Sequence, residues 1–120
     1  MAKILIIEDD TRLELTYNII FEQSGHTVIR AHDGEEGLQK AEAEEPNLIL
    51  LDLNMPKMGG LEFLRRYDVI NKHPFVKVVV FSNMQTEESI REAYSLGAYK
   101  YEVKATFSPK QVGALVEQAL

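Results

Sequence analysis

Short aliphatic runs alternate with amphipathic stretches about five times along the chain. An unbroken run such as Leu48–Leu51 is typical of a strand that is covered on both faces. Between the runs, hydrophobic residues such as Leu13, Tyr17 and Phe21 recur at helical spacing. The pattern predicts five strands, which we place at Ile4–Ile7, Thr27–Arg30, Leu48–Leu51, Val76–Phe81 and Lys100–Val103.

Helix-capping residues predict helices between these strands. Asp33 with Glu36, Thr86 with two following glutamates, and Ser108-Pro109-Lys110-Gln111 are all N-terminal signals. Gly25 and Gly97 are suitable helix ends, and residues 61–72 read as one further helix before Pro74. Strands that alternate with helices predict an α/β fold, a (βα)5 unit in which a doubly wound parallel sheet has helices on both faces. This pattern leaves the strand order open.

Length and composition narrow the function classes. A chain of 120 residues is expected to form one domain over residues 1–120. It has no cysteine, which excludes disulfides and thiolate metal sites. No apolar run approaches membrane-spanning length, so we expect a cytoplasmic protein with no membrane partner. The net charge of −6 disfavours direct binding to nucleic acid.

The polar residues directly after the predicted strands carry the candidate chemistry. Glu8 and Asp9 follow the first strand, Asp52 the third, Ser82 the fourth and Lys104 the fifth. Ligands of open parallel sheets bind beyond the carboxyl ends of the strands. We therefore expect these side chains to meet at one edge, while the next acid, Asp10, is more simply a cap of the first helix.

Three crowded carboxylates repel one another unless a cation holds them. Ligands that are all oxygen favour a hard cation, Mg²⁺ before a transition metal. A carboxylate beside such a cation can be a nucleophile that forms an aspartyl phosphate, and phosphoryl transfer needs mainly positioning and charge neutralisation. Asp52, with Lys104 and Ser82 as partners for the phosphoryl oxygens, fits that chemistry.

Taken together in their order along the sequence, several motifs resemble those of the receiver domains of two-component response regulators, and the resemblance covers essentially the whole chain. The matching segments are residues 4–10, 33–36, 51–56 with Gly60, Ser82, Gly97-Ala98 and residues 101–104. The resemblance implies a flavodoxin-like sheet of order 2-1-3-4-5. It implies that Asp52 is the phospho-acceptor, that Lys104 holds the phosphate, and that Ser82 and Tyr101 are a switch pair. It also implies an Mg²⁺ site, at which Mn²⁺ can take the place of Mg²⁺, formed by Glu8 (largely through water), Asp9, Asp52 and the backbone carbonyl of Asn54.

The resemblance also implies partners. A histidine kinase or histidine phosphotransfer protein would donate the phosphoryl group. The surface formed by the fourth helix, fifth strand and fifth helix would then be reshaped, by an inward turn of Tyr101, for a downstream protein or an output domain outside this chain. The resemblance implies that the receiver domain itself is a monomer or a phosphorylation-dependent dimer. We expect a signalling domain whose only catalysis is its own phosphorylation and dephosphorylation.

Two departures from the family pattern bear on the site, while a third, Gly59 where an acid is common, lies in a turn and carries little weight. Asn83 stands where a small residue is usual after the switch hydroxyl, and its bulk would narrow access to Asp52. Ala105 replaces the proline that usually follows the lysine in a cis bond. A cis bond before a residue other than proline costs about 3–4 kcal/mol, so the sequence leaves the isomer of the Lys104–Ala105 bond open.

Other functions remain as alternatives. The two departures keep open a pseudo-receiver that binds partners without phosphorylation. A phosphatase of the haloacid dehalogenase kind would need an acid where Asn54 stands. A flavodoxin-like flavin binder would need a phosphate-binding loop where this chain has acids after the first strand. The three histidines show no donor arrangement and are expected at the surface.

Overall fold

The computed structural model describes residues 1–120 and contains a single five-stranded parallel sheet. Its strands lie in the order β2-β1-β3-β4-β5, as the resemblance implied. Each strand lies within one residue of its predicted position at either end. The strands are β1 (Lys3–Ile7), β2 (Thr27–Ala31), β3 (Leu48–Leu51), β4 (Lys77–Ser82) and β5 (Lys100–Val103).

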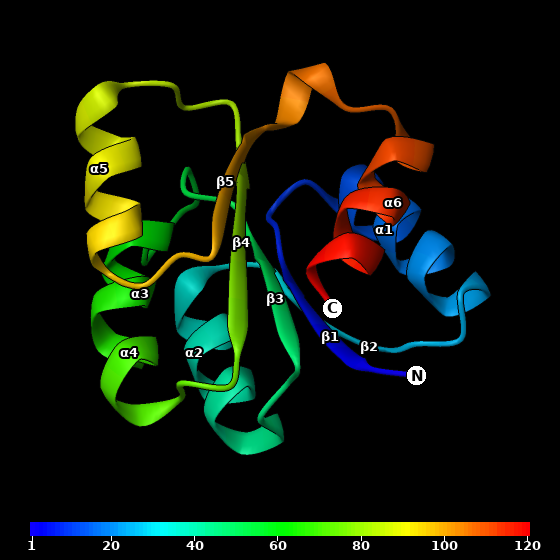
Figure 1. Ribbon diagram of the computed structural model, residues 1–120, viewed down its shortest axis with the longest axis horizontal. Helices are drawn as coiled ribbons and strands as arrows, with labels where there is room; N and C mark the ends of the chain where they lie inside the picture. Colours follow the sequence, from blue (N-terminus) through cyan, green and yellow to red (C-terminus); the bar gives the residue numbers. More distant parts are fainter.

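Helices cover both faces of the sheet (Figure 1). On one face lie α1 (Thr11–Gln23) and α6 (Pro109–Ala119), and on the other lie α2 (Gly34–Glu44), α3 (Gly60–Tyr67), the short α4 (Val69–Lys72) and α5 (Glu87–Ser95). One turn of 3₁₀ helix, η1 (Lys104–Thr106), follows β5. None of these helices has the length and hydropathy needed to cross a membrane. The predicted (βα)5 doubly wound fold is confirmed.

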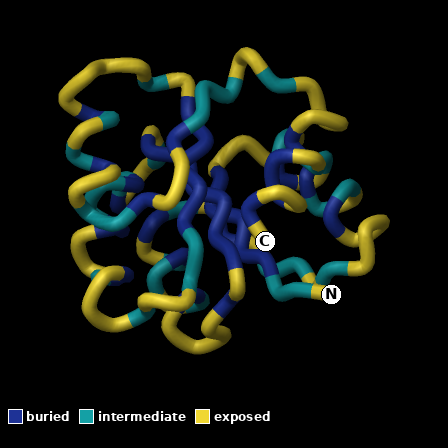
Figure 2. The backbone as a smooth tube through the Cα atoms, viewed as in Figure 1, coloured by how far each residue is buried: buried dark blue, intermediate teal, exposed yellow.

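The core consists of two hydrophobic layers separated by the sheet. Successive residues of β1 point to opposite layers: Leu5 packs with Phe63 and Tyr67, whereas Ile4 packs with Phe21 and other residues of α1 and α6. Figure 2 shows the buried central strands inside a shell of largely exposed helix and loop. The apolar runs of the sequence are therefore the strands that both helix layers cover.

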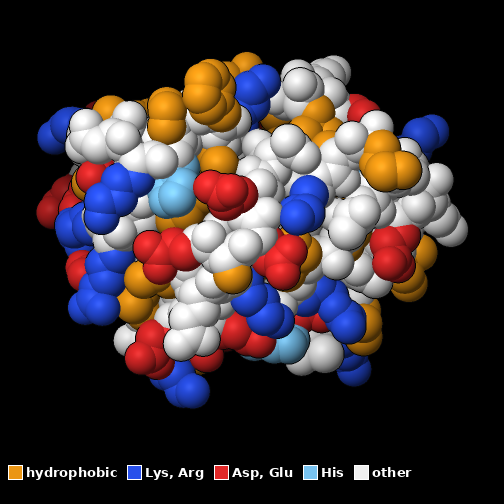
Figure 3. Space-filling view, turned by 90° about the horizontal axis from the view of Figure 1, so that it is seen from below, with side chains coloured by type: hydrophobic (Ala, Val, Ile, Leu, Met, Phe, Trp, Pro, Cys, Tyr) orange, Lys and Arg blue, Asp and Glu red, His pale blue; other side chains and the backbone are white.

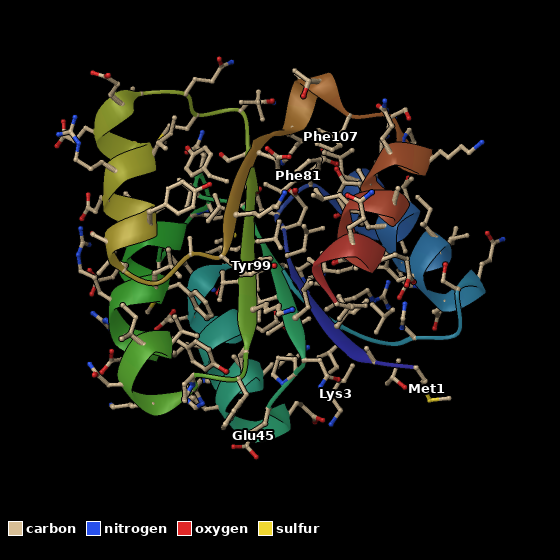
Figure 4. The ribbon with its side chains drawn as sticks, in the orientation of Figure 1. Met1, Lys3, Glu45, Phe81, Tyr99 and Phe107 are labelled. Carbon is tan, nitrogen blue, oxygen red and sulfur yellow. The ribbon has the colours of Figure 1, made fainter.

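Two aromatic side chains hold the chain between η1 and α6 on the sheet. The rings of Phe81 and Phe107, labelled in Figure 4, meet edge to face with centroids 5.3 Å apart. The capping box of Ser108 and Gln111 then starts α6, as the sequence predicted. Every peptide bond is trans, and this includes the bond between Lys104 and Ala105.

The single helix expected over residues 61–72 is divided in two. Asp68 has φ of 53°, a left-handed conformation that ends α3 and precedes α4. Such a residue turns the axis because its backbone no longer follows the right-handed helix. The expectation that all histidines lie at the surface was also wrong, because the His26 side chain is only 6% exposed and contacts Glu117 at 2.5 Å.

Candidate functional site

The sheet register brings the predicted residues to one edge. Ile7 is aligned with both Ala31 and Leu51, and Ser82 at the end of β4 is aligned with Val103 at the end of β5. Residues directly beyond β1, β3 and β5 therefore emerge at the carboxyl ends of neighbouring strands, at the top of Figure 1. The topology, rather than closeness in sequence, assembles the site.

Three carboxylates form the acidic part of this site. One oxygen each from Glu8, Asp9 and Asp52 lies within 4.8 Å of the others. Glu8 is 3% exposed and Asp52 is 6% exposed, while Asp9 is open to solvent. Two buried acids and one accessible acid thus face a common point.

Lys104 joins the two buried acids. Its ammonium donates to Glu8 Oε1 at 2.6 Å and to Asp52 Oδ2 at 3.3 Å. The predicted closeness of Lys104 to Asp52 is therefore present. Its shorter bond to Glu8 was not anticipated, since Glu8 was considered only as a metal ligand.

Burial sets the charge balance of this cluster. Removal from water raises the pKa of Glu8 to about 7, although the bond to Lys104 opposes that shift. Burial alone would favour neutral Lys104, but its bond to Glu8 and the charges of Glu8 and Asp52 raise the pKa of the lysine. Lys104 consequently stays protonated, and the cluster favours the binding of further positive charge.

Asp52 opens into a pocket of about 380 Å³. Its six lining residues are Asp52, Asn54, Ser82, Asn83, Met84 and Lys104. Ser82 is 1% exposed, and its hydroxyl oxygen accepts from the Met84 N–H at 3.3 Å. The pocket therefore places a carboxylate, a hydroxyl and an ammonium around a small space that Met84 also lines.

The loop after Asp52 is held in place by close packing. The Asn54 N–H donates to Asp52 Oδ1 at 3.3 Å. A Cβ at Gly60 would lie 2.5 Å from the Asp52 carbonyl oxygen and 2.7 Å from the Cα of Leu53. Only glycine allows α3 to start this close to Asp52.

Tyr101 lies behind the pocket rather than in it. The residue is 8% exposed, and its hydroxyl donates to the Met84 carbonyl at 2.5 Å. Met84 belongs to the loop that follows Ser82, the last residue of β4. Tyr101 is thus connected to the segment that carries the predicted switch hydroxyl, and its side chain already points inward.

A second link between loops was missed by the sequence analysis. The Ala105 N–H donates to the side-chain oxygen of Asn83 at 2.8 Å. Asn83 was considered for its bulk and Ala105 for its peptide isomer. The sequence signal that could have predicted this bond is that alanine, unlike proline, has a backbone N–H, which can donate to the oxygen of a nearby side-chain amide.

The opposite end of the molecule offers no comparable arrangement. Figure 3 views the end at which the strands begin, where acidic and basic side chains alternate with hydrophobic ones over the whole face. The clustered buried acids, the lysine and the pocket all lie at the other end. The chemistry of this chain is therefore concentrated at the carboxyl edge of the sheet.

Comparison with known families agrees with this geometry. The family described as "Response regulator receiver domain" matches residues 4–117. This chain is a receiver domain. The segment matched includes every candidate residue at the carboxyl edge, from Glu8 to Lys104.

Individual relatives support the same family. The chain is 35% identical over 119 residues to the alkaline phosphatase synthesis transcriptional regulatory protein PhoP of Bacillus subtilis, covering 98% of this chain and 48% of that protein. It is 31% identical over 102 residues to sporulation initiation phosphotransferase F of the same organism, covering 85% of this chain and 81% of that one. The chain spans about half the length of several curated relatives.

Solved structures share the fold. The chemotaxis protein CheY4 of Vibrio cholerae superimposes with a TM-score of 0.89 at 28% identity, over 100% of this chain and 99% of that one. A CheY-like receiver domain protein of Methanospirillum hungatei superimposes with a TM-score of 0.90 at 28% identity, over 99% and 93% of the two chains. The flavodoxin-like arrangement of this receiver domain is therefore common to chemotaxis and other response regulators.

Proposed function

We propose that this receiver domain accepts a phosphoryl group on Asp52 from a phosphohistidine of a histidine kinase or phosphotransfer protein. The observation that carries the proposal is the position of Asp52, a buried acid that opens into a small pocket with the Lys104 ammonium at 3.3 Å. The name of one relative, a phosphotransferase, agrees with this chemistry.

The transfer would proceed by direct displacement. A carboxylate oxygen of Asp52 attacks phosphorus, and the bond between phosphorus and the donor imidazole nitrogen breaks. The imidazole keeps the electron pair and takes up a proton. Lys104 neutralises one phosphoryl oxygen and the Ser82 hydroxyl donates to another, which is the positioning and charge stabilisation that phosphoryl transfer requires.

The donor set fits a divalent cation. Three carboxylates from Glu8, Asp9 and Asp52 converge without a nitrogen or sulfur ligand, and burial makes the charge of Glu8 costly without a counter-ion. Together with the backbone carbonyl of Asn54, these residues would hold Mg²⁺ or, in its place, Mn²⁺. When bound, the cation supplies neutralisation of charge on the transferring group.

The signal would leave the site through β4 and β5. Ser82 and Tyr101 meet the same segment around Met84, through the bonds to the Met84 N–H and carbonyl. A phosphoryl group that draws Ser82 toward Asp52 would therefore displace this segment and alter the surface of α5, β5 and α6. That surface would bind a downstream protein or an output domain in the cytoplasm, with the receiver as a monomer or a phosphorylation-dependent dimer.

Incubation with acetyl phosphate and Mg²⁺ tests the proposal. We expect intact-mass measurement to show one added phosphoryl group in the native chain and none in Asp52→Asn. The matched control Asp68→Asn changes an acid that does not line the pocket of Asp52, and this variant should be phosphorylated like the native protein. Removal of Mg²⁺ by a chelator should abolish the added mass.

The same experiment can refute the proposal. A native chain that gains no mass with Mg²⁺, and whose amide NMR spectrum is unchanged by beryllofluoride, would instead be a phosphorylation-independent interaction module. Continuous turnover of small phosphate esters would favour a phosphatase.

A further inference from the structure

One hydrogen bond continues the connection between β4 and β5 beyond the end of the sheet. The last aligned pair of these strands is Ser82 with Val103. Asn83 is the first residue after β4, and its side-chain oxygen accepts from the Ala105 N–H at 2.8 Å. The loop with the switch hydroxyl and the loop with Lys104 are thus joined by a side chain after their backbone pairing has ended.

The chemistry of the two groups fixes this contact. A backbone N–H can only donate, so the oxygen of the Asn83 amide must face Ala105 while its NH₂ points elsewhere. Ala105 lies in the single turn of η1, where the first N–H groups have no partner within the helix. The internal backbone bond of this turn runs from the Phe107 N–H to the Lys104 carbonyl. Asn83 therefore acts as an external cap of η1.

The capped turn begins at Lys104. The ammonium of this residue is held 2.6 Å from Glu8 and 3.3 Å from Asp52, and its side chain is 12% exposed. A lysine side chain has a limited length, so the position of its backbone decides which groups the ammonium can reach. A cap on the next residue limits the movement of that backbone.

We propose that Asn83 is a positioning residue that holds the η1 turn, and with it Lys104, in place for phosphoryl transfer to Asp52. This inference rests on the proposed function. In this chain a side-chain acceptor on one loop and a free backbone N–H on the other replace the rigidity that a proline would give. Ala105 is needed as the donor, since a proline has no N–H to offer.

A steric role of Asn83 and a positioning role predict opposite changes in the rate of phosphorylation when Asn83 is replaced by alanine. If Asn83 mainly blocks access to Asp52, then Asn83→Ala should accelerate phosphorylation. If Asn83 mainly positions Lys104, then Asn83→Ala should slow it, by about 3- to 10-fold, as expected for the loss of one hydrogen bond of ordinary strength. The direction of the change therefore separates the two roles.

Amide hydrogen exchange tests the tether without any phosphoryl chemistry. In the metal-free native protein we expect the Ala105 amide to be protected. Asn83→Ala should reduce its protection by about 3- to 10-fold, whereas Asn83→Asp, which keeps an oxygen acceptor, should retain it. The matched control Gln85→Ala removes an exposed amide from the same loop and should leave Ala105 unchanged. Unaltered protection in Asn83→Ala would overturn the tether.

A double-mutant cycle tests the role in transfer. The rate of Mg²⁺-dependent phosphorylation by acetyl phosphate is compared in the native chain, Asn83→Ala, Lys104→Ala and the double variant. We expect Asn83→Ala to slow the native reaction and to have no further effect once Lys104 is absent. A faster reaction of Asn83→Ala in both backgrounds would show a steric role, and an equal loss in both would show a role independent of Lys104. Either result overturns the inference.

Failure of the inference and failure of the proposed function give different results. A native chain that is never phosphorylated refutes the function and with it this role. A native chain that is phosphorylated, with Asn83→Ala at the native rate, refutes the positioning role alone. Urea unfolding midpoints of all variants, measured in parallel, establish that the rates compare folded proteins.

Discussion

The Glu8 carboxylate shows how single residues set the electrostatics of the site. It is buried beside Asp52, and its nearest positive charge is Lys104 at 2.6 Å. One ammonium is shared by two buried acids, so it cannot neutralise both. Burial raises the pKa of Glu8 to about 7, because the single ammonium offsets the cost of removal from water only in part. Without a cation, the site therefore favours an extra proton near neutral pH.

This proton predicts a pH-dependent stability of the metal-free protein. The pKa of Glu8 is about 7 in the folded chain against an ordinary value of 4.5, so between these values the folded state binds more protons than the unfolded state. The free energy of unfolding should then fall as the pH rises from about 4.5 to about 7, by at most about 1.4 kcal/mol per pH unit for one proton. Urea unfolding in the presence of a chelator measures this slope.

Two comparisons make the pH experiment specific to Glu8. Glu8→Gln should remove the contribution of this residue to the pH dependence of the free energy of unfolding, because the glutamine does not titrate. Mg²⁺ should stabilise the native chain more at higher pH, since it binds the deprotonated ligands. A native metal-free chain that becomes more stable across the same range would contradict the assigned burial cost.

At the scale of elements, hydrophobic pattern and capping residues were sufficient for the sheet and most helices. The strands β1, β3 and β4 were predictable because each contains an apolar run of the length that a covered parallel sheet needs, whereas the edge strands β2 and β5 carry polar residues and give a weaker signal. The site acids followed from the rule that strand ends meet. The break at Asp68 was not predictable, because a left-handed residue inside a helical pattern depends on tertiary packing rather than on its own preference.

Contacts between side chains of different loops also escaped the sequence. The bond from Ala105 to Asn83 joins residues 22 positions apart, and the bond from Lys104 to Glu8 joins residues 96 positions apart. Both depend on how far each chain runs past its strand before it turns. Periodicity gives the strand but not the path of the loop, so the candidate residues were predictable and their partners were not.

The end of α2 provides a prediction at the element scale. Glu45 closes this helix with φ of 46°, in the left-handed region that a Cβ disfavours by roughly 1–2 kcal/mol. Glu45→Gly should therefore raise the free energy of unfolding, by up to about 1 kcal/mol after the greater flexibility of the unfolded chain is included. The matched variant Glu42→Gly, inside the helix, should lower it by about 0.5–1 kcal/mol. Urea unfolding of both variants checks the opposite signs, and equal signs would contradict the left-handed cap.

At the scale of the whole molecule, the sheet connects the pocket to the surface of α5, β5 and α6. The inward position of Tyr101 bears directly on this connection. Its hydroxyl donates to the Met84 carbonyl at 2.5 Å and its backbone N–H donates to the Tyr94 hydroxyl at 3.0 Å. The bond of the hydroxyl and the burial of the ring favour the inward position by themselves, so phosphorylation would not need to supply the free energy for turning this ring inward.

We therefore expect the ring of Tyr101 to remain buried before and after phosphorylation. With fluorotyrosine in all tyrosines, and Tyr101→Phe to assign its signal, a soluble paramagnetic agent should broaden the exposed rings of Tyr94 and Tyr99 but not that of Tyr101. Beryllofluoride with Mg²⁺ should leave this protection unchanged while it shifts the amides of Ser82 and Met84. A Tyr101 signal that is broadened in the free protein and protected by beryllofluoride would show the opposite equilibrium, in which the ring lies outward at rest. Moving such an equilibrium from 1:99 to 99:1 takes about 5.5 kcal/mol of differential binding, so an inward resting ring leaves more of the phosphoryl binding energy for movement of the β4–α5 loop.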